Sequence, residues 1–452
     1  MDTAKPRKMS KDEKVKMVIN KLVGEKACFY DGSTLYVKEE KGKNCLWTPL
    51  DKRSAKRWLA STYFKGEPAS YALSSAAYNE ILVSKDLFGT IEKKSTSLIL
   101  TKNGIINLLD GHFVENDADE IFTRECDFEF CAHTNSYDVA PNWEKFLKTS
   151  LGIDVRTPGG IRETSNEKKL ELVEQMLTYA VSGLFGAKKM ILLLGPTNSG
   201  KSVLLEFIRR VVGQENTVPL SLDDLITRFR SSLLKGKCLV INDELTGGAL
   251  KGLDTIKKVV SGEPMIVEAK GAAPENIKPM VKMIFGANQL PDLDEYDSGH
   301  AFADRLVILN FPNSVPRDDW DTELVDKLFK ERDVIMSLAV KHSTKFAQNL
   351  SFTMDEEGTQ ILSDYKNRNA TVESFINDNY AHAEDTPDKK ARIPILELYS
   401  FYETYVSENA LAAVNLSTFR QRLLANDFVL KKARTVDDRN VSCVVGIKPI
   451  ET

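Results

Sequence analysis

Apolar residues recur at helical spacing in two long stretches of this chain. Residues 10–13 read Ser-Lys-Asp-Glu, which matches a capping box, so a helix is expected to begin there. The apolar positions that follow share one helical face: Val15, Val18, Ile19 and Leu22. Residues 166–181 show the same period, and their apolar face consists of Leu170, Val173, Leu177 and Ala180.

Short apolar runs between these helices predict strands. Three strands joined by tight turns are expected over residues 98–100, 104–108 and 111–113. Further apolar runs with polar residues at their ends occupy residues 190–194, 239–241, 283–285 and 306–309. Since helical and strand patterns alternate along the chain, we expect an α/β fold.

Residues 256–278 predict a helix followed by a hairpin. A strand over residues 265–268 ends in Lys270 and Gly271, and the chain returns through Pro274 to Lys278. The hairpin therefore has a basic tip. Lys270 is the main candidate for contact with a nucleic-acid backbone, and Lys278 is a second one. A solvated loop without a ligand is the alternative interpretation.

The C-terminal residues predict two helices, over 393–406 and 418–424, and then a hairpin over 428–445. Helix, helix and hairpin form the outline of a winged helix, which places its second helix in the major groove of DNA. Phe419 and Leu423 would face inward. The candidate DNA contacts lie on the other faces of that helix and on the hairpin: Thr418, Arg420, Gln421, Arg422, Lys431, Lys432, Arg434 and Arg439. A small packing domain that contacts other subunits is the alternative.

These changes of pattern divide the chain into four expected regions. They are a basic N-terminal region over 1–60, a mixed α/β region over 61–165, a central α/β domain over 166–367 and the C-terminal domain over 368–452.

The composition limits the class of protein further. With 42% hydrophobic and 28% charged residues, the chain is ordinary for a soluble globular protein. No apolar run approaches the ~18 residues that cross a bilayer, so no membrane contact is expected. Six cysteines are too few for a disulfide scaffold, which favours a reducing compartment. Cys126, Cys131 and His133 lack a fourth metal ligand, so we expect buried thiols there rather than zinc.

Charge is distributed unevenly along the chain. Residues 1–60 hold 15 Lys and Arg against 8 Asp and Glu, and residues 389–452 hold 10 against 7. The total is −4, so the residues between carry about −14. Basic ends on an acidic middle favour contact with nucleic acid at the ends, although two solvated faces would look the same.

The strongest motif lies directly after the apolar run at 190–194. Residues 195–202 match G-x-x-x-x-G-K-[ST], with a strand before the loop and a helical pattern after it, as a P-loop requires. Lys201 would reach the β- and γ-phosphates of ATP, and the Ser202 hydroxyl would hold Mg²⁺. The expected phosphate cradle consists of Gly195, Pro196, Thr197, Asn198, Ser199, Gly200, Lys201 and Ser202.

Polar residues at the ends of two later apolar runs supply further candidates. Phosphoryl transfer needs a carboxylate near Mg²⁺ and a group that orients the attacking water. Asp243 is expected in the metal shell, and Glu244 is expected to activate water. Asn288 would bond the γ-phosphate or the water, or it is an ordinary turn residue at a strand end. The residues that follow Asn288 lack the N-K-x-D of GTPases.

Arg305 stands immediately before the apolar run at 306–309. An arginine in this place could act across a subunit boundary as an arginine finger, which is typically worth ~10³–10⁵ in rate. A surface salt bridge with Asp304 is the alternative.

In this order the motifs resemble those of the superfamily 3 helicases of viruses, phages and their satellites. The poxvirus and phage-satellite primase-helicase branch is the most similar. The residues that carry the likeness are 195–202, 242–245 (Asn-Asp-Glu-Leu), 261–263 (Ser-Gly-Glu), 286–291 (Gly-Ala-Asn-Gln-Leu-Pro) and 302–306 (Phe-Ala-Asp-Arg-Leu). It covers residues 95–312 well and the ends loosely.

The resemblance implies an AAA+-like ATPase core with a parallel sheet, a helicase-associated collar before it and a winged-helix domain after it. It also implies a homo-hexameric ring, translocation along single-stranded DNA, 3′ to 5′, and a place in the host cell cytoplasm. Relatives often carry a primase domain, and residues 1–95 leave no room for one. Asp117 and Asp119 alone do not make a primase centre, so a separate primase is expected.

Two other functions stay open at this point. An ATP-switched, origin-binding initiator would keep the C-terminal domain without separating strands. A P-loop kinase of a small substrate would not need the arrangement of Asn288 and Arg305.

Overall fold

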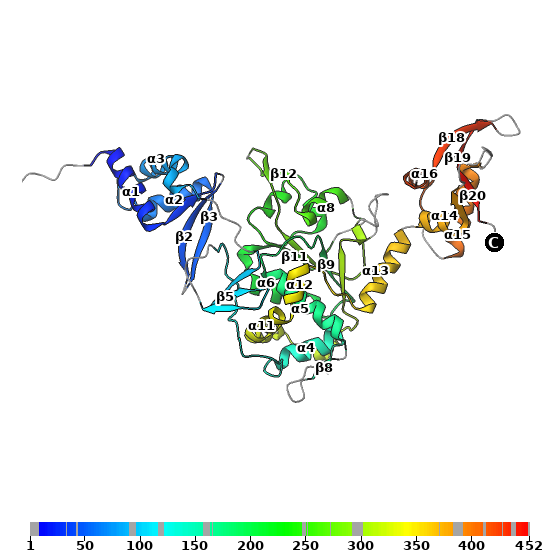
Figure 1. Cartoon of the computed structure of the whole chain (residues 1–452), viewed down its shortest axis with the longest axis horizontal. Coiled ribbons are helices and arrows are strands. Elements are labelled where there is room, and N and C mark those ends of the chain that lie inside the picture. The colour runs from blue at the N-terminus through cyan, green and yellow to red at the C-terminus, as the bar shows by residue number, and fades with distance from the viewer. Residues whose placement is uncertain are drawn as a thin grey trace, which may run out of the picture.

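This computed structural model shows three units, each with its own hydrophobic core (Figure 1). The N-terminal unit is blue in Figure 1, the central unit runs from cyan to yellow, and the C-terminal unit is orange to red. The residues described are 9–32, 34–41, 44–89, 96–115, 122–156, 163–164, 166–245, 250, 252–271, 273–291, 302–369, 371–382, 392–409, 413–426, 428–434 and 440–450.

The N-terminal unit packs three helices on a small antiparallel sheet. Its elements are α1 (Lys11–Glu25), β1 (Cys28–Tyr30), β2 (Leu35–Lys41), β3 (Asn44–Leu50), α2 (Lys52–Thr62) and α3 (Ser70–Val83). The capping box at the start of α1 is confirmed, because the Glu13 amide donates to Ser10 Oγ and the Ser10 amide donates to Glu13 Oε2. Leu59 of α2 and Ile81 of α3 share one core. That core runs across the expected boundary at residue 60, which falls inside α2.

The next segment packs mainly on the central unit, while Leu100 and Ile105 form a small cluster with Leu46 of β3. Its elements are β4 (Leu98–Thr101), β5 (Gly104–Asn107), β6 (Phe113–Glu115) and α4 (Pro141–Leu151). The third strand begins at Phe113 rather than at residue 111, because Gly111 has φ +72° and the His112 amide donates to Asp110 in a turn. The rings of Trp143 on α4 and Phe207 on α6 are 5.9 Å apart, so α4 shares the core of the central sheet.

A five-stranded parallel sheet forms the centre of the molecule, as the α/β pattern predicted. Its order is β10 (Thr217–Val218), β11 (Leu239–Asn242), β14 (Lys282–Ala287), β9 (Met190–Leu194) and β15 (Leu306–Asn310). Alternate residues of β9 belong to different cores: Ile191 and Leu193 pack on one face, and Leu192 packs on the other. Helices therefore cover both faces of the sheet.

Six helices carry most of this packing. They are α5 (Glu167–Val181), α6 (Lys201–Val212), α8 (Leu253–Ser261), α10 (Leu324–Lys330), α11 (Arg332–His342) and α13 (Glu356–Asn369). The pattern predicted a single apolar face on α5, but almost the whole helix is buried, including Glu174. Glu174 Oε1 accepts a hydrogen bond from the Tyr137 hydroxyl (2.7 Å) and lies 2.9 Å from His342 Nδ1, so this oxygen has polar partners inside the core.

The hairpin predicted after α8 is confirmed. Its strands are β12 (Met265–Val267) and β13 (Glu275–Ile277), paired antiparallel with Met265 opposite Ile277. Gly271 in the turn has φ +80°, a conformation that glycine adopts without strain.

The C-terminal unit combines three helices with short antiparallel sheets. Its elements are α14 (Thr371–Asn379), β16 (Tyr380–His382), β17 (Arg392–Pro394), α15 (Ile395–Glu408), α16 (Leu416–Ala425), β18 (Val429–Arg434), β19 (Asn440–Val445) and β20 (Ile447–Pro449). The helix expected from residue 393 begins at Ile395, because Ile393 and Pro394 pair with β19. In the part of the chain described, no helix has the length and apolar character needed to span a membrane.

Candidate functional site

The predicted P-loop connects β9 to α6 at the carboxyl edge of the parallel sheet. Asn198 and Gly200 have positive φ values of 63° and 96°, which turn the loop around the amino end of α6. A Cβ atom at Gly195 would lie 2.2 Å from the carbonyl oxygen of Phe311. The loop therefore requires glycine at position 195 for packing and favours it at position 200 for conformation.

Lys201 is held inside this loop. Only 8% of its surface is exposed, and its Nζ donates to the carbonyl oxygens of Gly195 (2.8 Å) and Pro196 (2.6 Å) and to Ser199 Oγ (3.1 Å). Burial lowers the pKa of Lys201. A loop with αL residues at the amino end of a helix, with a lysine inside it, is a suitable binding site for phosphate.

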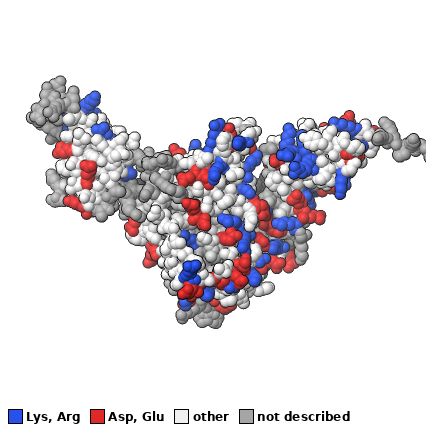
Figure 2. Space-filling view, turned by 180° about the vertical axis from the view of Figure 1, so that it is seen from behind, with Lys and Arg blue, Asp and Glu red and all other residues white. Residues whose placement is uncertain are grey.

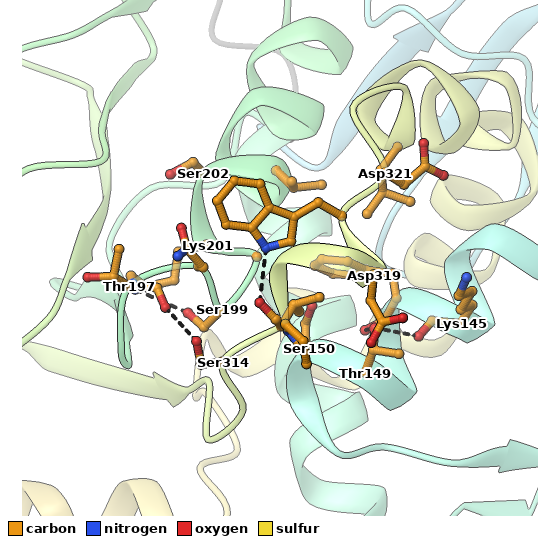
Figure 3. Close-up of a pocket in the computed structure, with 18 of the residues that line it drawn as sticks. Lys145, Thr149, Ser150, Thr197, Ser199, Lys201, Ser202, Ser314, Asp319 and Asp321 are labelled. Carbon is orange, nitrogen blue, oxygen red and sulfur yellow. Dashed lines mark hydrogen bonds between the residues drawn. The ribbon is translucent and has the colours of Figure 1, made fainter.

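The loop opens into a cavity of about 810 Å³ (Figure 3). Asp243 follows β11 and Asn288 follows β14, and both line this cavity with the P-loop. The strands are parallel, so their carboxyl ends meet at one edge. The Gly195 amide donates to the Ala287 carbonyl oxygen (3.1 Å), which holds the segment before Asn288 against the P-loop.

Ser202 and Asp243 supply a hydroxyl and a carboxylate to the same cavity. Oxygen donors of this kind, together with phosphate oxygens, suit Mg²⁺, which usually keeps several water ligands. Among the residues that the structure describes, no group of three or more His, Cys, Asp and Glu side chains could hold a metal ion alone.

Four residues predicted for this site lie outside the cavity lining: Gly195 and Pro196 of the loop, and the predicted catalytic residues Glu244 and Arg305. Glu244 is exposed, and its amide donates to Asn242 Oδ1 (3.1 Å). Arg305 lies at the amino edge of the sheet, where its carbonyl oxygen accepts from the Met190 amide. The five residues of β9 separate that edge from the P-loop by about 17 Å at ~3.3 Å per residue.

Near Arg305, the carboxylate of Asp304 pairs with Lys366 at 2.6 Å. Of the two thiols expected to be buried, Cys126 is buried and Cys131 is half-buried. The Cys126 thiol is buried, and burial raises its pKa to about 12, so it stays protonated. Asp117 and Asp119 lie outside the described residues.

The hairpin projects from the central unit, as Figure 1 shows for β12. Lys270 and Lys278 are exposed, at the turn and just after β13. Two ion pairs tie the hairpin to the chain around η4 (Arg230–Leu234): Arg228 with Glu268, at 2.8 and 3.1 Å, and Lys235 with Glu275, at 2.8 Å.

In the C-terminal unit, most of the predicted surface residues are accessible. Phe419 and Leu423 of α16 are fully buried, as expected, and Gln421 is exposed. Thr418 and Arg420 are half-buried, and Lys431 and Lys432 on β18 are exposed. The side chains of Arg434 and Arg439 lie outside the described residues.

Arg422 was expected on the outward face of α16, and this orientation is wrong. It is only 8% exposed and lies 3.5 Å from Glu373 of α14. Arg422 is buried because α14 covers the side of α16 that an isolated helix would present to solvent.

Figure 2 shows Lys and Arg gathered on the N-terminal unit, which lies on the right in that view. This agrees with the positive balance of residues 1–60. The helix α2 contributes Lys52, Arg53, Lys56 and Arg57 and has no acidic residue.

Two family models match separate parts of the chain. Residues 13–152 match the family "D5 N terminal like", and residues 193–305 match DUF5906, a family of unknown function. The "D5 N terminal like" match begins at residue 13, whereas the motif resemblance to superfamily 3 helicases begins at about residue 95. It agrees, in coarse terms, with the predicted likeness to phage and viral replication proteins of the primase-helicase type.

A solved structure with a TM-score above 0.5 shares the fold over nearly the whole chain. The apo NrS-1 C terminal region is 11% identical, with a TM-score of 0.52 over 97% of this chain and 100% of that chain. Its A form is 12% identical, with a TM-score of 0.49 over 94% of this chain and 98% of that chain.

Several residues that line the cavity were not predicted from the sequence. Lys145, Phe146 and Ser150 come from α4, and Asp319 and Trp320 come from the segment after β15. The one local signal was a tryptophan within a charged stretch, Arg-Asp-Asp-Trp-Asp at 317–321.

Proposed function

We propose that this chain is an ATP-dependent DNA helicase that works as a hexameric ring and helps to initiate replication of a mobile element or virus. The observation that carries the proposal is the cavity shared by the P-loop, Asp243 and Asn288. The strand order, with β9 between β14 and β15, is consistent with the AAA+-like core that the resemblance implies.

In this proposal each polar group has one task. Lys201 holds the β- and γ-phosphates of ATP, and Ser202 and Asp243 hold Mg²⁺, which neutralises charge on those phosphates. Asn288 bonds the γ-phosphate or the attacking water. Glu244, one residue beyond the metal carboxylate, orients that water once nucleotide binds.

The position of Arg305 supports a site that is shared between subunits. It stands at the edge of the sheet opposite the P-loop, about 17 Å from it by strand length. An arginine there does not reach the phosphates of its own chain, but it can face the cavity of a neighbour in a ring with head-to-tail contacts.

The test mixes Lys201→Ala and Arg305→Ala chains before assembly and measures ATPase activity. Each parent alone should be inactive. In a one-to-one mixture, about a quarter of the interfaces would pair an intact P-loop with an intact arginine. Partial recovery would support shared sites, whereas activity no higher than that of the parents would contradict them.

The DNA contacts are proposed at two places. Lys270, with Lys278 as a second contact, would follow a single strand in the central channel, 3′ to 5′. The exposed residues of α16 and β18 would hold origin duplex, in the manner of a winged helix. A separate primase would act on the unwound strand, in the host cell cytoplasm.

Because those C-terminal residues are exposed, an ATP-switched initiator without strand separation is the second candidate. A forked-duplex unwinding assay separates the two functions, with Glu244→Gln as the hydrolysis-deficient control. Unwinding by the wild type and none by Glu244→Gln supports the helicase. ATP-dependent origin binding without unwinding by either protein supports the initiator.

A further inference from the structure

The segment that follows β15 forms one wall of the nucleotide cavity. The Val315 amide donates to the Asn198 carbonyl oxygen (2.9 Å), and Ser314 Oγ donates to that of Thr197 (3.0 Å). Figure 3 shows Ser314 beside Thr197 and Ser199 of the P-loop. These bonds fix the wall to the loop, so its side chains have defined positions in the cavity.

Trp320 is the largest side chain on this wall. Its indole is 48% exposed although it lines a cavity. Its orientation is set by Nε1, which donates to the Val315 carbonyl oxygen (3.0 Å), and by the Arg317 guanidinium, 6.0 Å from the ring centroid. A fixed, half-exposed aromatic ring inside a cavity is suited to stack on a planar ligand.

The strand order determines which part of a nucleotide would reach this ring. β14 and β11 lie on one side of β9, and β15 lies on the other. Asp243 and Asn288 therefore mark the end of the cavity for the γ-phosphate and metal. A nucleotide bound there would extend across the P-loop, and its base would lie toward α4 and the segment after β15.

Resting on the proposed nucleotide site, we propose that Trp320 is the platform on which the base of the bound nucleoside triphosphate stacks. The ligand class is a purine nucleotide, because a fused ring system covers more of an indole than a pyrimidine does. Stacking involves the face of the base and not its hydrogen-bonding edge, so it tolerates different bases. Trp320 should therefore favour purines over pyrimidines more strongly than adenine over guanine.

The test compares two probes, Mg-ATP and inorganic tripolyphosphate with Mg²⁺, because the second lacks a base. Binding of both is measured by calorimetry to the full-length chain and to Trp320→Ala, Trp320→Leu and Trp320→Phe. Phe401→Ala is the matched control, since Phe401 has the same exposed fraction of 48% but lies on α15, outside the cavity. Thermal unfolding reports whether each variant folds.

We expect Trp320→Ala and Trp320→Leu to weaken ATP binding about 5- to 150-fold, the range of a single base–aromatic stack. Trp320→Phe should keep most of the affinity. Tripolyphosphate should bind all of these proteins equally, and Phe401→Ala should match the wild type with both probes.

Three other outcomes would overturn the inference. Unchanged ATP affinity in Trp320→Ala would show that the base does not stack on Trp320. An equal loss for ATP and tripolyphosphate would assign Trp320 to the architecture of the phosphate site. If the wild-type chain binds neither probe, the nucleotide site itself is wrong, and this result is distinct because it does not depend on the Trp320 variants.

Discussion

Gly200 shows how one residue connects the P-loop to α4. Its φ is +96°, and a Cβ atom there would lie 2.5 Å from Ser150 Oγ and 3.0 Å from the ring of Phe146. Gly271 at the hairpin turn has a similar φ of +80°, but no atom lies within 4 Å of its virtual Cβ. The two glycines thus share a backbone constraint and differ in steric surroundings.

We therefore predict different outcomes for the same substitution at these positions. Gly271→Ala should lower the unfolding free energy by about 1 kcal/mol, the cost of the left-handed conformation alone. Gly200→Ala should lower it further and weaken ATP binding at least about tenfold, because the loop must move away from α4. Chemical denaturation and calorimetry measure both. Equal effects of the two substitutions would contradict the assigned role of the contact with α4.

Lys282 is a buried lysine at the amino end of β14. Its Nζ donates to the Ser182 carbonyl oxygen and lies 4.9 Å from the centroid of the Tyr179 ring. Burial, with a further contribution from the nearby Arg124, lowers the pKa of Lys282 well below its usual value. The unfolded chain therefore binds more protons than the folded chain between the folded pKa and ~10.4.

This difference predicts a pH dependence with a defined sign. Stability should rise with pH in that window, by at most about 1.4 kcal/mol per pH unit. Lys282→Met should lack this contribution, so the stability of the wild type relative to the variant should increase between pH 7 and 9. Urea denaturation at several pH values measures it, and the comparison cancels the titration of other groups. Parallel profiles would show that Lys282 titrates normally.

At the scale of elements, the hairpin is connected to the cavity at the P-loop through a short segment. The Leu222 amide of α7 (Leu222–Leu225) donates to the Leu245 carbonyl oxygen (3.0 Å), two residues after Asp243. The chain then leads to Arg228, which forms a bidentate pair with Glu268 before the hairpin turn. Movement at the carboxyl end of β11 can thus reach the hairpin.

The proposed function predicts that this pair transmits motion and adds little stability. The Arg228 side chain is 72% exposed, and exposed ion pairs contribute weakly. Arg228→Glu and Glu268→Arg should each lower the stimulation of ATPase activity by single-stranded DNA, while basal activity and melting temperature stay near those of the wild type. The double swap should restore stimulation, since it re-forms the pair. A double variant as defective as the single ones would contradict the proposal that the Arg228–Glu268 pair transmits motion.

At the scale of the whole molecule, the C-terminal unit includes α14. Val372 and Phe375 of α14 are buried in one core with Tyr402 and Phe419, and the rings of Phe375 and Tyr402 are 5.7 Å apart. The helix before it, α13, packs instead on the central sheet through Tyr365. The two units therefore separate between α13 and α14.

A truncation series should locate this boundary. A chain ending at Asn369 should retain the unfolding transition of the central unit and its ATPase activity, but lose preference for origin DNA. A chain ending at Asp388 should bind a hydrophobic dye and aggregate, because it exposes Val372 and Phe375 without their partners. Calorimetry measures the unfolding transition of each truncated chain, and dye fluorescence measures its exposed apolar surface. If the shorter chain were the less stable one, α14 would belong to the central unit.

Local patterns were sufficient for the elements whose signals lie within a few residues. Ser10 and Glu13 formed the predicted capping box, and the hairpin at β12 and β13 was confirmed. The strand, loop and helix around Lys201 lie where the motif predicted them. These features depend on caps, turns and hydrophobic period, which act over one or two turns of chain.

Orientation within the folded molecule did not follow from those patterns. Arg422 lies against Glu373 because α14 covers α16, and α5 is buried on nearly all sides. A helical period identifies one apolar face, but it does not show which further elements cover the other faces.

The sequence by itself determined the P-loop, the polar residues that end later strands and the presence of an α/β fold. Only the tertiary structure brought Asp243 and Asn288 to that loop, placed Arg305 at the opposite edge and positioned Trp320 on the cavity wall. The physical reason is that strand order depends on long crossover connections. Their packing is decided by contacts between residues far apart in the chain, which no local pattern specifies.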